Sequence, residues 1–387
     1  MTNKAKRLVS VPLGDIHLMS NRVTCKQLIR CLSWALNKGS RTNQQIDILY
    51  LNGDLLDRLV AMNHPEMPEV IQWFRHMLLD AKANDRQVRV LEGTPSHDWR
   101  QVRTLLALNS DGDFEGEGIN ADVKYFDKVE IEYNDKHDIH VLYIPDLKVS
   151  ADEMWSRVQK EMSRLRIDMV DYTLAHGAFM HQLPPAARQG SQGHHTHDPD
   201  HYADITRHAV LCNHVHKPSS YRNVHGGGSL DRISHGEEHA KGYLRVTQIG
   251  DSSTTEFIEN PFACIFTTVD AAELNSKDVL LTVSNIVESN PFVPVNIRII
   301  AHREDEVSGL IEKLKHRYPE VKFTFDLRNK TVAQDTIQAL KEDDLTQKIV
   351  LTRETLQSEL LQIVSVQHPD DTDRVKKLIG DVIAARS

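Results

Sequence analysis

Runs of apolar residues alternate with helical patterns along the first 220 positions of the chain. Five apolar runs of strand length end in polar clusters that contain Asp or His: "RLVSVPLGDIH", "IDILYLNGDLLDR", "QVRVLEGTPSHD", "DMVDYTLAHG" and "HAVLCNHVHKP". Apolar residues at helical spacing lie between them, on faces within 25–36, 70–81 and 154–165. Strands that alternate with helices predict a layered α/β domain, and ligands of such domains bind at the carboxyl ends of the strands.

The pattern changes after about residue 260. The runs "ACIFTTVD", "VPVNIRIIA" and "EVKFTFDL" alternate like half-buried strands, and apolar residues at helical spacing separate the last two. A charged stretch follows, and then two amphipathic helical patterns close the chain. We therefore expect an α/β domain over 1–260, a small α+β domain over 261–330, a linker over 331–350 and C-terminal helices over 351–387.

The composition is that of an ordinary soluble protein, with 387 residues of which 40% are hydrophobic and 26% charged. The net charge of −9 argues against a protein that coats nucleic acid through bulk charge, but an enzyme can still hold a few phosphates locally. The four cysteines form no C-x-x-C pair, so neither a disulfide framework nor a zinc finger is expected. No long apolar run and no signal-peptide pattern stand in the sequence, which predicts no membrane segment and a cytoplasmic location.

Pairs of potential metal ligands follow two of the predicted strands. Asp15 and His17, like His214 and His216, are separated by one residue, so in an extended strand both members of a pair would face the same side. Imidazole and carboxylate together suit divalent metals. Each piece alone is weak, because a His near a strand end is usually structural and the G-D-x-x-D at 53–57 can be a turn with an Asp cap. Their shared position at strand ends favours a metal site.

The order of these motifs resembles that of the calcineurin-like metallophosphoesterases across residues 8–218. The resemblance implies a two-sheet α/β sandwich that holds two divalent metals bridged by one carboxylate. It assigns to the first metal Asp15, His17, Asp54 and His216. It assigns to the second metal Asp54, His176, His214 and the residue at the family's Gly-Asn-His-Asp position.

A further stretch, "GGGSLDRISHGEEHAKGYLRV" at 226–246, is similar to a segment of SbcD-type DNA exonucleases, the nuclease subunits of double-strand-break repair complexes. This resemblance implies a nuclease that acts on double-stranded DNA ends and on single strands, with Mn²⁺ or alternatively Mg²⁺. It also implies that the small domain caps DNA, that the terminal helices dock on an SbcC-type coiled-coil ATPase, and that the chain forms a homodimer. The insert "GHHTHDPDHYAD" resembles loops of phage versions, so a phage protein in the host cytoplasm is one expectation.

Three residues are candidates for the chemistry itself. His97 would donate a proton to the leaving oxygen, and Asp57 would orient His97. Arg58 would hold a phosphate oxygen, although a solvated residue at a helix start is an equally good interpretation of it.

The stretch "GTPSHDW" at 93–99 departs from the family's Gly-Asn-His-Asp. Ser96 stands directly before His97, and we predict its hydroxyl as a weak ligand of the second metal. The alternative is that Ser96 only caps the following helix. Thr94 is a less favoured substitute, because Pro95 stiffens the turn between it and His97.

Two rival functions stay open at this point. A stand-alone phosphodiesterase or phosphatase for small molecules would use the same metals, but it does not account for 226–246 or for the extra residues 261–387. An inactive scaffold that binds DNA ends is supported only by the altered "GTPSHD".

Overall fold

The computed structural model describes residues 7–36, 45–110, 118–184, 196–271, 274–301 and 308–327. The chain divides into two compact units, Met1–Arg328 and Asn329–Ser387. The expected boundary at residue 260 therefore falls inside the first unit. The expected linker 331–350 and helices 351–387 lie outside the described residues. Within the described ranges, no helix has the length and apolar character needed to cross a membrane.

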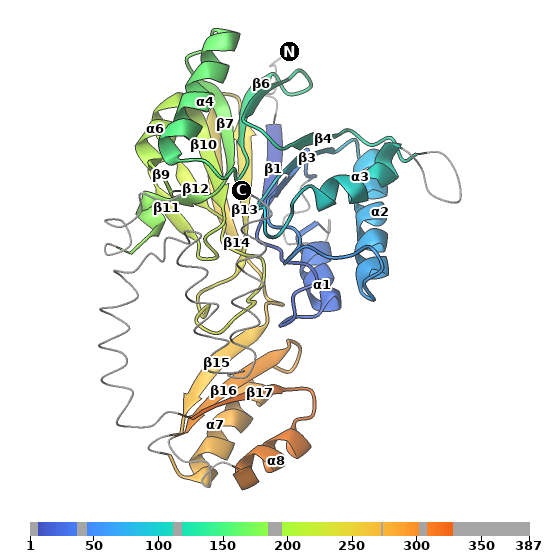
Figure 1. Cartoon of the computed structure of the whole chain (residues 1–387), viewed down its shortest axis with the longest axis vertical. Coiled ribbons are helices and arrows are strands. Elements are labelled where there is room, and N and C mark those ends of the chain that lie inside the picture. Colours follow the sequence, from blue (N-terminus) through green and yellow to red (C-terminus); the bar gives the residue numbers. More distant parts are fainter. Residues whose placement is uncertain are drawn as a thin grey trace, which may run out of the picture. The chain divides into compact units, whose positions relative to one another are not determined.

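Two six-stranded sheets form the larger part of the first unit (Figure 1). In the first sheet the order is β14-β13-β1-β2-β3-β4, and β1 to β4 run parallel while β13 and β14 form an antiparallel hairpin at one edge. The bounds are β1 Arg7–Leu13, β2 Ile48–Asn52, β3 Gln87–Leu91, β4 Val123–Phe126, β13 Gly242–Ile249 and β14 Ser252–Glu259. Strands β2 and β3 are buried along their whole length, as expected for parallel strands covered on both faces.

The second sheet has the order β11-β12-β10-β7-β6-β5, with a parallel centre and antiparallel edge strands β5 and β11. Its bounds are β5 Glu130–Asn134, β6 Ile139–Ile144, β7 Val170–His176, β10 Thr206–Asn213, β11 Ser219–Tyr221 and β12 Val224–Gly226. A short two-stranded pair joins β8 (Ala178–Phe179) to β9 (Thr196–His197), and the 3-10 helix η1 (Met180–Gln182) follows β8.

Apolar side chains define four layers. One buried cluster takes Tyr50 and Leu91 from the first sheet together with Tyr143 and Leu174 from the second, so the two sheets face each other. Helices α1 (Cys25–Leu36), α2 (Met67–Ala83) and α3 (Gln101–Ser110) cover the outer face of the first sheet. Helices α4 (Ala151–Leu165) and α6 (Pro199–Ile205) cover the second sheet (Figure 1). The predicted two-sheet α/β sandwich is confirmed.

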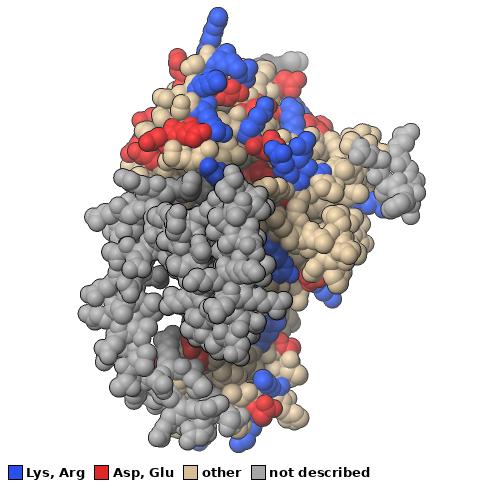
Figure 2. Space-filling view, viewed as in Figure 1, with Lys and Arg blue, Asp and Glu red and all other residues tan. Residues whose placement is uncertain are grey.

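The helix boundaries follow from local chemistry. Ser150 caps α4, because its hydroxyl accepts a hydrogen bond from the Glu153 backbone N–H, and Arg166 ends the helix in the left-handed conformation. The buried stripe Met154, Val158 and Met162 repeats every four residues, as the sequence pattern predicted. Opposite charges pair along the outer side of α4, and Figure 2 shows basic and acidic side chains interspersed around this end of the molecule.

Residues 265–327 have a sheet and a core of their own. The elements are β15 (Ile265–Asp270), α7 (Ser276–Glu288), β16 (Val295–Ala301), α8 (Ser308–Arg317) and β17 (Lys322–Leu327). All three strands run parallel, so this segment is a β-α-β-α-β unit of the α/β class and not the α+β domain that we expected. The pattern did not reveal α7, and a helix after each of the first two strands provides the crossovers that parallel strands require.

Candidate metal centre

All six predicted Asp and His metal ligands lie just beyond, or at, the carboxyl ends of four strands. Asp15 and His17 follow β1, Asp54 follows β2, His176 ends β7, and His214 and His216 follow β10. The structure brings these residues into two groups of three, each of which can hold a metal ion. The first group is Asp15, His17 and His216, and the second is Asp54, His176 and His214.

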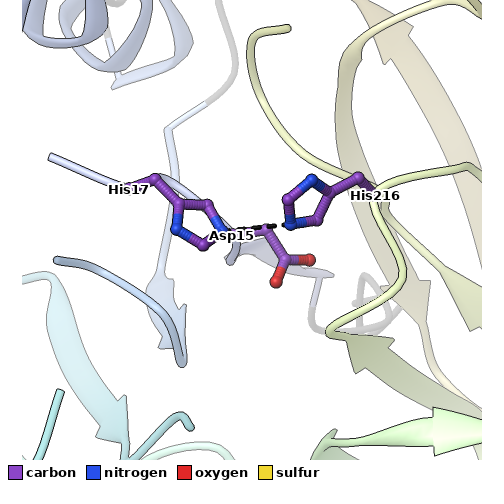
Figure 3. A group of neighbouring side chains, drawn as sticks. All are labelled: Asp15, His17 and His216. Atoms are coloured by element: carbon purple, nitrogen blue, oxygen red, sulfur yellow. Dashed lines mark hydrogen bonds between the residues drawn. The ribbon is translucent and has the colours of Figure 1, made fainter. Parts of the chain in front are cut away.

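The imidazoles of the first group meet directly. His17 Nε2 lies 3.0 Å from His216 Nε2 (Figure 3). On the far side of each ring, His17 Nδ1 lies 3.3 Å from a carboxylate oxygen of Asp57, and His216 Nδ1 lies 3.0 Å from one of Glu237. When each Nδ1 carries the proton that faces its carboxylate, the two Nε2 atoms turn lone pairs toward each other. A cation bound between them would satisfy both lone pairs.

Asp15 supplies the negative charge of the first group. Its side chain is only 1% exposed, and its Oδ2 accepts hydrogen bonds from the His214 backbone N–H at 2.9 Å and from Asn213 Nδ2 at 3.2 Å. Its Oδ1 is buried and has no hydrogen-bond partner among the described residues. A buried, unpartnered carboxylate oxygen is costly by itself, so the residues present fit a bound metal ion.

The second group is more deeply buried. His176 is fully buried, with Nδ1 at 2.8 Å from the Asn52 carbonyl oxygen and Nε2 at 3.2 Å from Asp54 Oδ2. Burial acts to lower the pKa of His176, but the charge and hydrogen bond of Asp54 outweigh it and raise that pKa to about 10. Burial also works against ionisation of Asp54, yet His176 holds the Asp54 pKa well below its usual range. A metal ion at this position would therefore replace the imidazole proton.

Thr94, and not Ser96, lies against the second group. The Thr94 backbone N–H donates to Asp54 Oδ1 at 2.6 Å, and Thr94 Oγ1 lies 3.1 Å from Asp54 Oδ2 and 3.5 Å from both His176 Nε2 and His214 Nδ1. Ser96 is exposed. The prediction of Ser96 as a ligand, and the argument that Pro95 disfavours Thr94, are not supported by this geometry.

The turn after β3 explains this outcome. The Thr94 carbonyl accepts hydrogen bonds from the backbone N–H groups of His97 at 2.8 Å and Asp98 at 3.0 Å. Pro95 stands at the second position of that turn, where its restricted φ is favourable. The rigid ring therefore helps to turn Ser96 outward, and Thr94, at the start of the turn, is the residue that faces Asp54.

The backbone at the ligands is unusual. Asp15, His17 and Asp54 have φ of 51°, 53° and 49°, and His214 has φ of 126°. These values lie in the left-handed region that non-glycine residues rarely adopt, and such residues cluster at functional sites. The argument from alternating strand residues was therefore wrong in its geometry, because Asp15 and His17 lie beyond β1. His214 and His216 accordingly enter different groups.

Two glycines allow the strand ends to approach one another. A Cβ at Gly53, which has φ of +78°, would stand 2.2 Å from His176 Nδ1. A Cβ at Gly93 would stand 2.4 Å from Asp54 Oδ1. Both contacts are closer than atoms tolerate, so the glycines of "NGD" and "EGT" are required by close packing around the second group.

Asp98 ties these two loops together, a role that the sequence interpretation missed. Its Oδ1 accepts hydrogen bonds from the backbone N–H groups of Leu55 and Leu56, and its Oδ2 accepts one from Gly93. Burial, followed by the negative charge of Asp54, raises the pKa of Asp98 to about 7. Its place in "SHD" was the signal available in the sequence.

His97, the predicted proton donor, lies beside the first group. Its ring stands edge-on to the ring of His17 with centroids 5.0 Å apart, and its Nδ1 contacts the Asp57 backbone carbonyl. The Asp57 carboxylate faces His17 and not His97. Asp57 therefore orients His97 through its carbonyl oxygen and His17 through its side chain, which refines the role predicted for it.

A cavity of about 440 Å³ opens over both groups. His97, Asp57, Asp54, His214 and His216 are among the described residues that line it. Arg58 is not among those lining residues, and its carbonyl oxygen accepts a hydrogen bond from Gln101 at 3.2 Å.

Among the described residues that line the cavity, the arginine is Arg22, an exposed residue of the loop between β1 and α1. No motif had marked it in the sequence.

The segment 226–246 forms a hydrogen-bond network around His216 of the first group. The buried Lys241 Nζ donates to Glu237 Oε2 at 2.7 Å, to Ser229 Oγ at 2.7 Å and to the His216 carbonyl at 3.0 Å. Arg232 donates to the carbonyl oxygens of Glu237, His239 and Cys264, each at 2.9 Å. These bonds hold Glu237 against His216, so the segment orients a ligand of the first group.

Comparison with known proteins adds little to this description. No family model and no curated protein matches the sequence. Among solved structures, a glutamine-dependent NAD⁺ synthetase from Acinetobacter baumannii in complex with ADP is similar at a TM-score of 0.29 and 10% identity, over 94% of this chain and 73% of that chain. A structural similarity this low supports no conclusion about function.

Proposed function

We propose that this protein is a two-metal phosphodiester hydrolase of the calcineurin-like metallophosphoesterase type, and within it a DNA nuclease of SbcD type. The observation that supports this most is the pair of Asp/His groups that line one cavity, with His97 beside them. Two divalent ions held there would lower the pKa of a bound water and offset the charge of a phosphodiester. Mn²⁺ suits the mixed imidazole and carboxylate donors better than Mg²⁺, which prefers oxygen ligands.

The chain's own residues divide the remaining work. Because His97 Nδ1 is engaged by the Asp57 carbonyl, Nε2 is the atom of this ring that donates a proton to the leaving oxygen. Arg22 binds a phosphate oxygen at the cavity wall. The Asp54 carboxylate, held by the Thr94 backbone N–H, would hold the second metal, and the resemblance to the family implies that it would also reach the first.

DNA is the substrate class that we favour over small phosphate esters. The support is the segment 226–246, which builds a network around His216, and the additional α/β unit at 265–327, which a small-molecule hydrolase of this type does not need. The net charge of −9 is compatible with an enzyme that holds DNA locally at its metal site, but not with a protein that coats DNA through bulk charge. An inactive scaffold has no need for two intact ligand groups.

The proposal is tested by cleavage assays with Mn²⁺, with Mg²⁺ and after chelation. The substrates are end-labelled linear duplex DNA, circular single-stranded DNA and bis-nitrophenyl phosphate. We expect Mn²⁺-dependent loss of nucleotides from duplex ends and nicking of the circle, both abolished by chelation. Hydrolysis of the nitrophenyl ester alone would favour a small-molecule enzyme, and DNA binding with no cleavage would favour a scaffold.

We further propose that the protein is a homodimer that works with an SbcC-type ATPase, and that this ATPase docks on residues 351–387. The proposed location is the cytoplasm, which for a phage protein is that of the host cell. Apolar stripes on those two predicted helices suit docking into a groove. Deletion of 350–387 should leave a folded nuclease that the ATPase no longer stimulates. A truncated chain that fails to fold would show instead that the stripes belong to its own core.

A further inference from the structure

The hydroxyl of Thr94 lies close to all three candidate ligand residues of the second group. Asp54 Oδ2, His176 Nε2 and His214 Nδ1 surround Oγ1 at 3.1, 3.5 and 3.5 Å. The Nδ1 atom of His176 faces the Asn52 carbonyl oxygen at 2.8 Å, so Nε2 is the ring nitrogen on the side of Thr94. The hydroxyl oxygen and the three candidate ligand atoms therefore converge on one small volume, as ligands do around a cation.

Thr94 is also held in place more firmly than a surface hydroxyl. Its backbone N–H donates to Asp54 Oδ1 at 2.6 Å, and its carbonyl closes the turn with His97 and Asp98. Gly93 packs directly against Asp54, so the start of this loop lies against the second group. The hydroxyl is therefore presented to the second group by backbone contacts and needs little side-chain ordering to bind a ligand.

We propose that Thr94 Oγ1 is the fourth protein ligand of the second metal position, together with Asp54, His176 and His214. This inference depends on the two-metal site of the proposed function and specifies its second position. A neutral hydroxyl is a weaker donor than an amide or carboxylate oxygen. The second position therefore binds its ion more weakly than the first, and it fills only at higher Mn²⁺ concentration.

Metal binding itself tests the inference, with no substrate present. Titration of the metal-free full chain with Mn²⁺, followed by the paramagnetic signal of free and bound ion, should show two unequal sites. Thr94→Val keeps the shape and removes the hydroxyl, and we expect it to weaken the second site about 10-fold or more while the first is unchanged. Thr94→Ser keeps the hydroxyl and should stay within about threefold of the parent. Ser96→Ala, the exposed neighbour, is the matched control and should overlay the parent.

A cysteine replacement tests direct coordination. Thiolate is a soft ligand, so Thr94→Cys should bind Cd²⁺ with a sulfur-to-metal charge-transfer absorption that Ser96→Cys lacks. The four native cysteines are buried and are the same in both variants, so they give the same background. No such absorption, or a Thr94→Val titration that overlays the parent, would overturn the inference. If the variants behave as expected but the parent cleaves no DNA, the ligand stands and the nuclease proposal fails.

Discussion

The two Asp/His groups differ in what lies behind their imidazoles. In the first group, His17 and His216 each face a carboxylate, from Asp57 and Glu237. In the second, His176 faces the neutral carbonyl of Asn52, and the extra oxygen nearby is the hydroxyl of Thr94. A carboxylate behind an imidazole raises its basicity as a metal ligand. The two groups therefore contain nearly the same residue types but differ in the residues that contact their imidazole rings.

The two groups are nevertheless linked. Asp15 of the first group accepts a hydrogen bond from the His214 backbone N–H of the second. Asn52 donates to Asn213 Oδ1 at 2.9 Å and to carbonyl oxygens of Ala175 and Leu211, and so joins the ends of the two sheets. The difference between the positions therefore comes from the residues behind the ligands and not from separate scaffolds.

The largest expected effect comes from Asp54→Asn, which removes the carboxylate of the second group. Loss of a metal ion removes several kcal/mol of stabilisation of the charge in the transition state, so the cleavage rate should fall about 10³-fold or more. The measurements are bound Mn²⁺ per chain and the rate of end digestion. An unchanged melting temperature of the metal-free variant would exclude misfolding, and retention of two bound ions with full cleavage would contradict the assignment.

His97→Asn separates chemistry from metal binding. Both positions should fill as in the parent, but cleavage should fall about 10²-fold, the scale of general acid catalysis. Single-turnover rates with saturating Mn²⁺ measure this loss. Weakened metal binding in the variant would instead make His97 a support of the first group.

Asp57→Asn tests the carboxylate behind His17. The neutral amide should make His17 a poorer ligand and weaken the first position about 10-fold, with the second unchanged. Glu237→Gln should do the same through His216, and it should also lower the melting temperature, because the buried Lys241 loses its ion pair. Titration with Mn²⁺ resolves the two positions. Equal weakening of both would mean that they are not distinguished by these carboxylates.

The smallest effect is expected from Arg22→Gln, with Arg58→Gln as its matched control. Arg22 lines the cavity and is exposed, so its loss should raise KM for DNA a few-fold and leave metal binding and kcat nearly unchanged. Arg58→Gln should change neither constant. The reverse result would restore the phosphate role to Arg58.

Local periodicity was enough to predict much of this molecule. The helical faces predicted at 25–36, 70–81 and 154–165 lie in α1, α2 and α4, and the predicted strand runs correspond to β1, β2, β3, β7 and β10. The Asp and His residues that follow β1, β2 and β10, together with His176 at the end of β7, form the two candidate metal-binding groups. Periodicity shows which side of a helix or strand is buried, so it predicts the elements. The carboxyl ends of parallel strands meet at one edge of a sheet, so the residues that follow them are predicted to lie together. Both predictions use information that short stretches of the chain carry.

Only the tertiary structure decided the finer assignments. The sequence favoured Ser96 over Thr94 as the residue beside the second group, and the hydrogen bonds of a single turn place Thr94 there instead. Arg22 follows Asp15 and His17 in one loop, but only the fold shows that this loop lines the cavity. His214 and His216 enter different groups, and His214 has a positive φ. Likewise, Glu237 contacts His216 within a network to which the buried Lys241 and Arg232 both contribute. These choices depend on how distant loops meet across two sheets, and a local pattern of apolar and polar residues does not encode that.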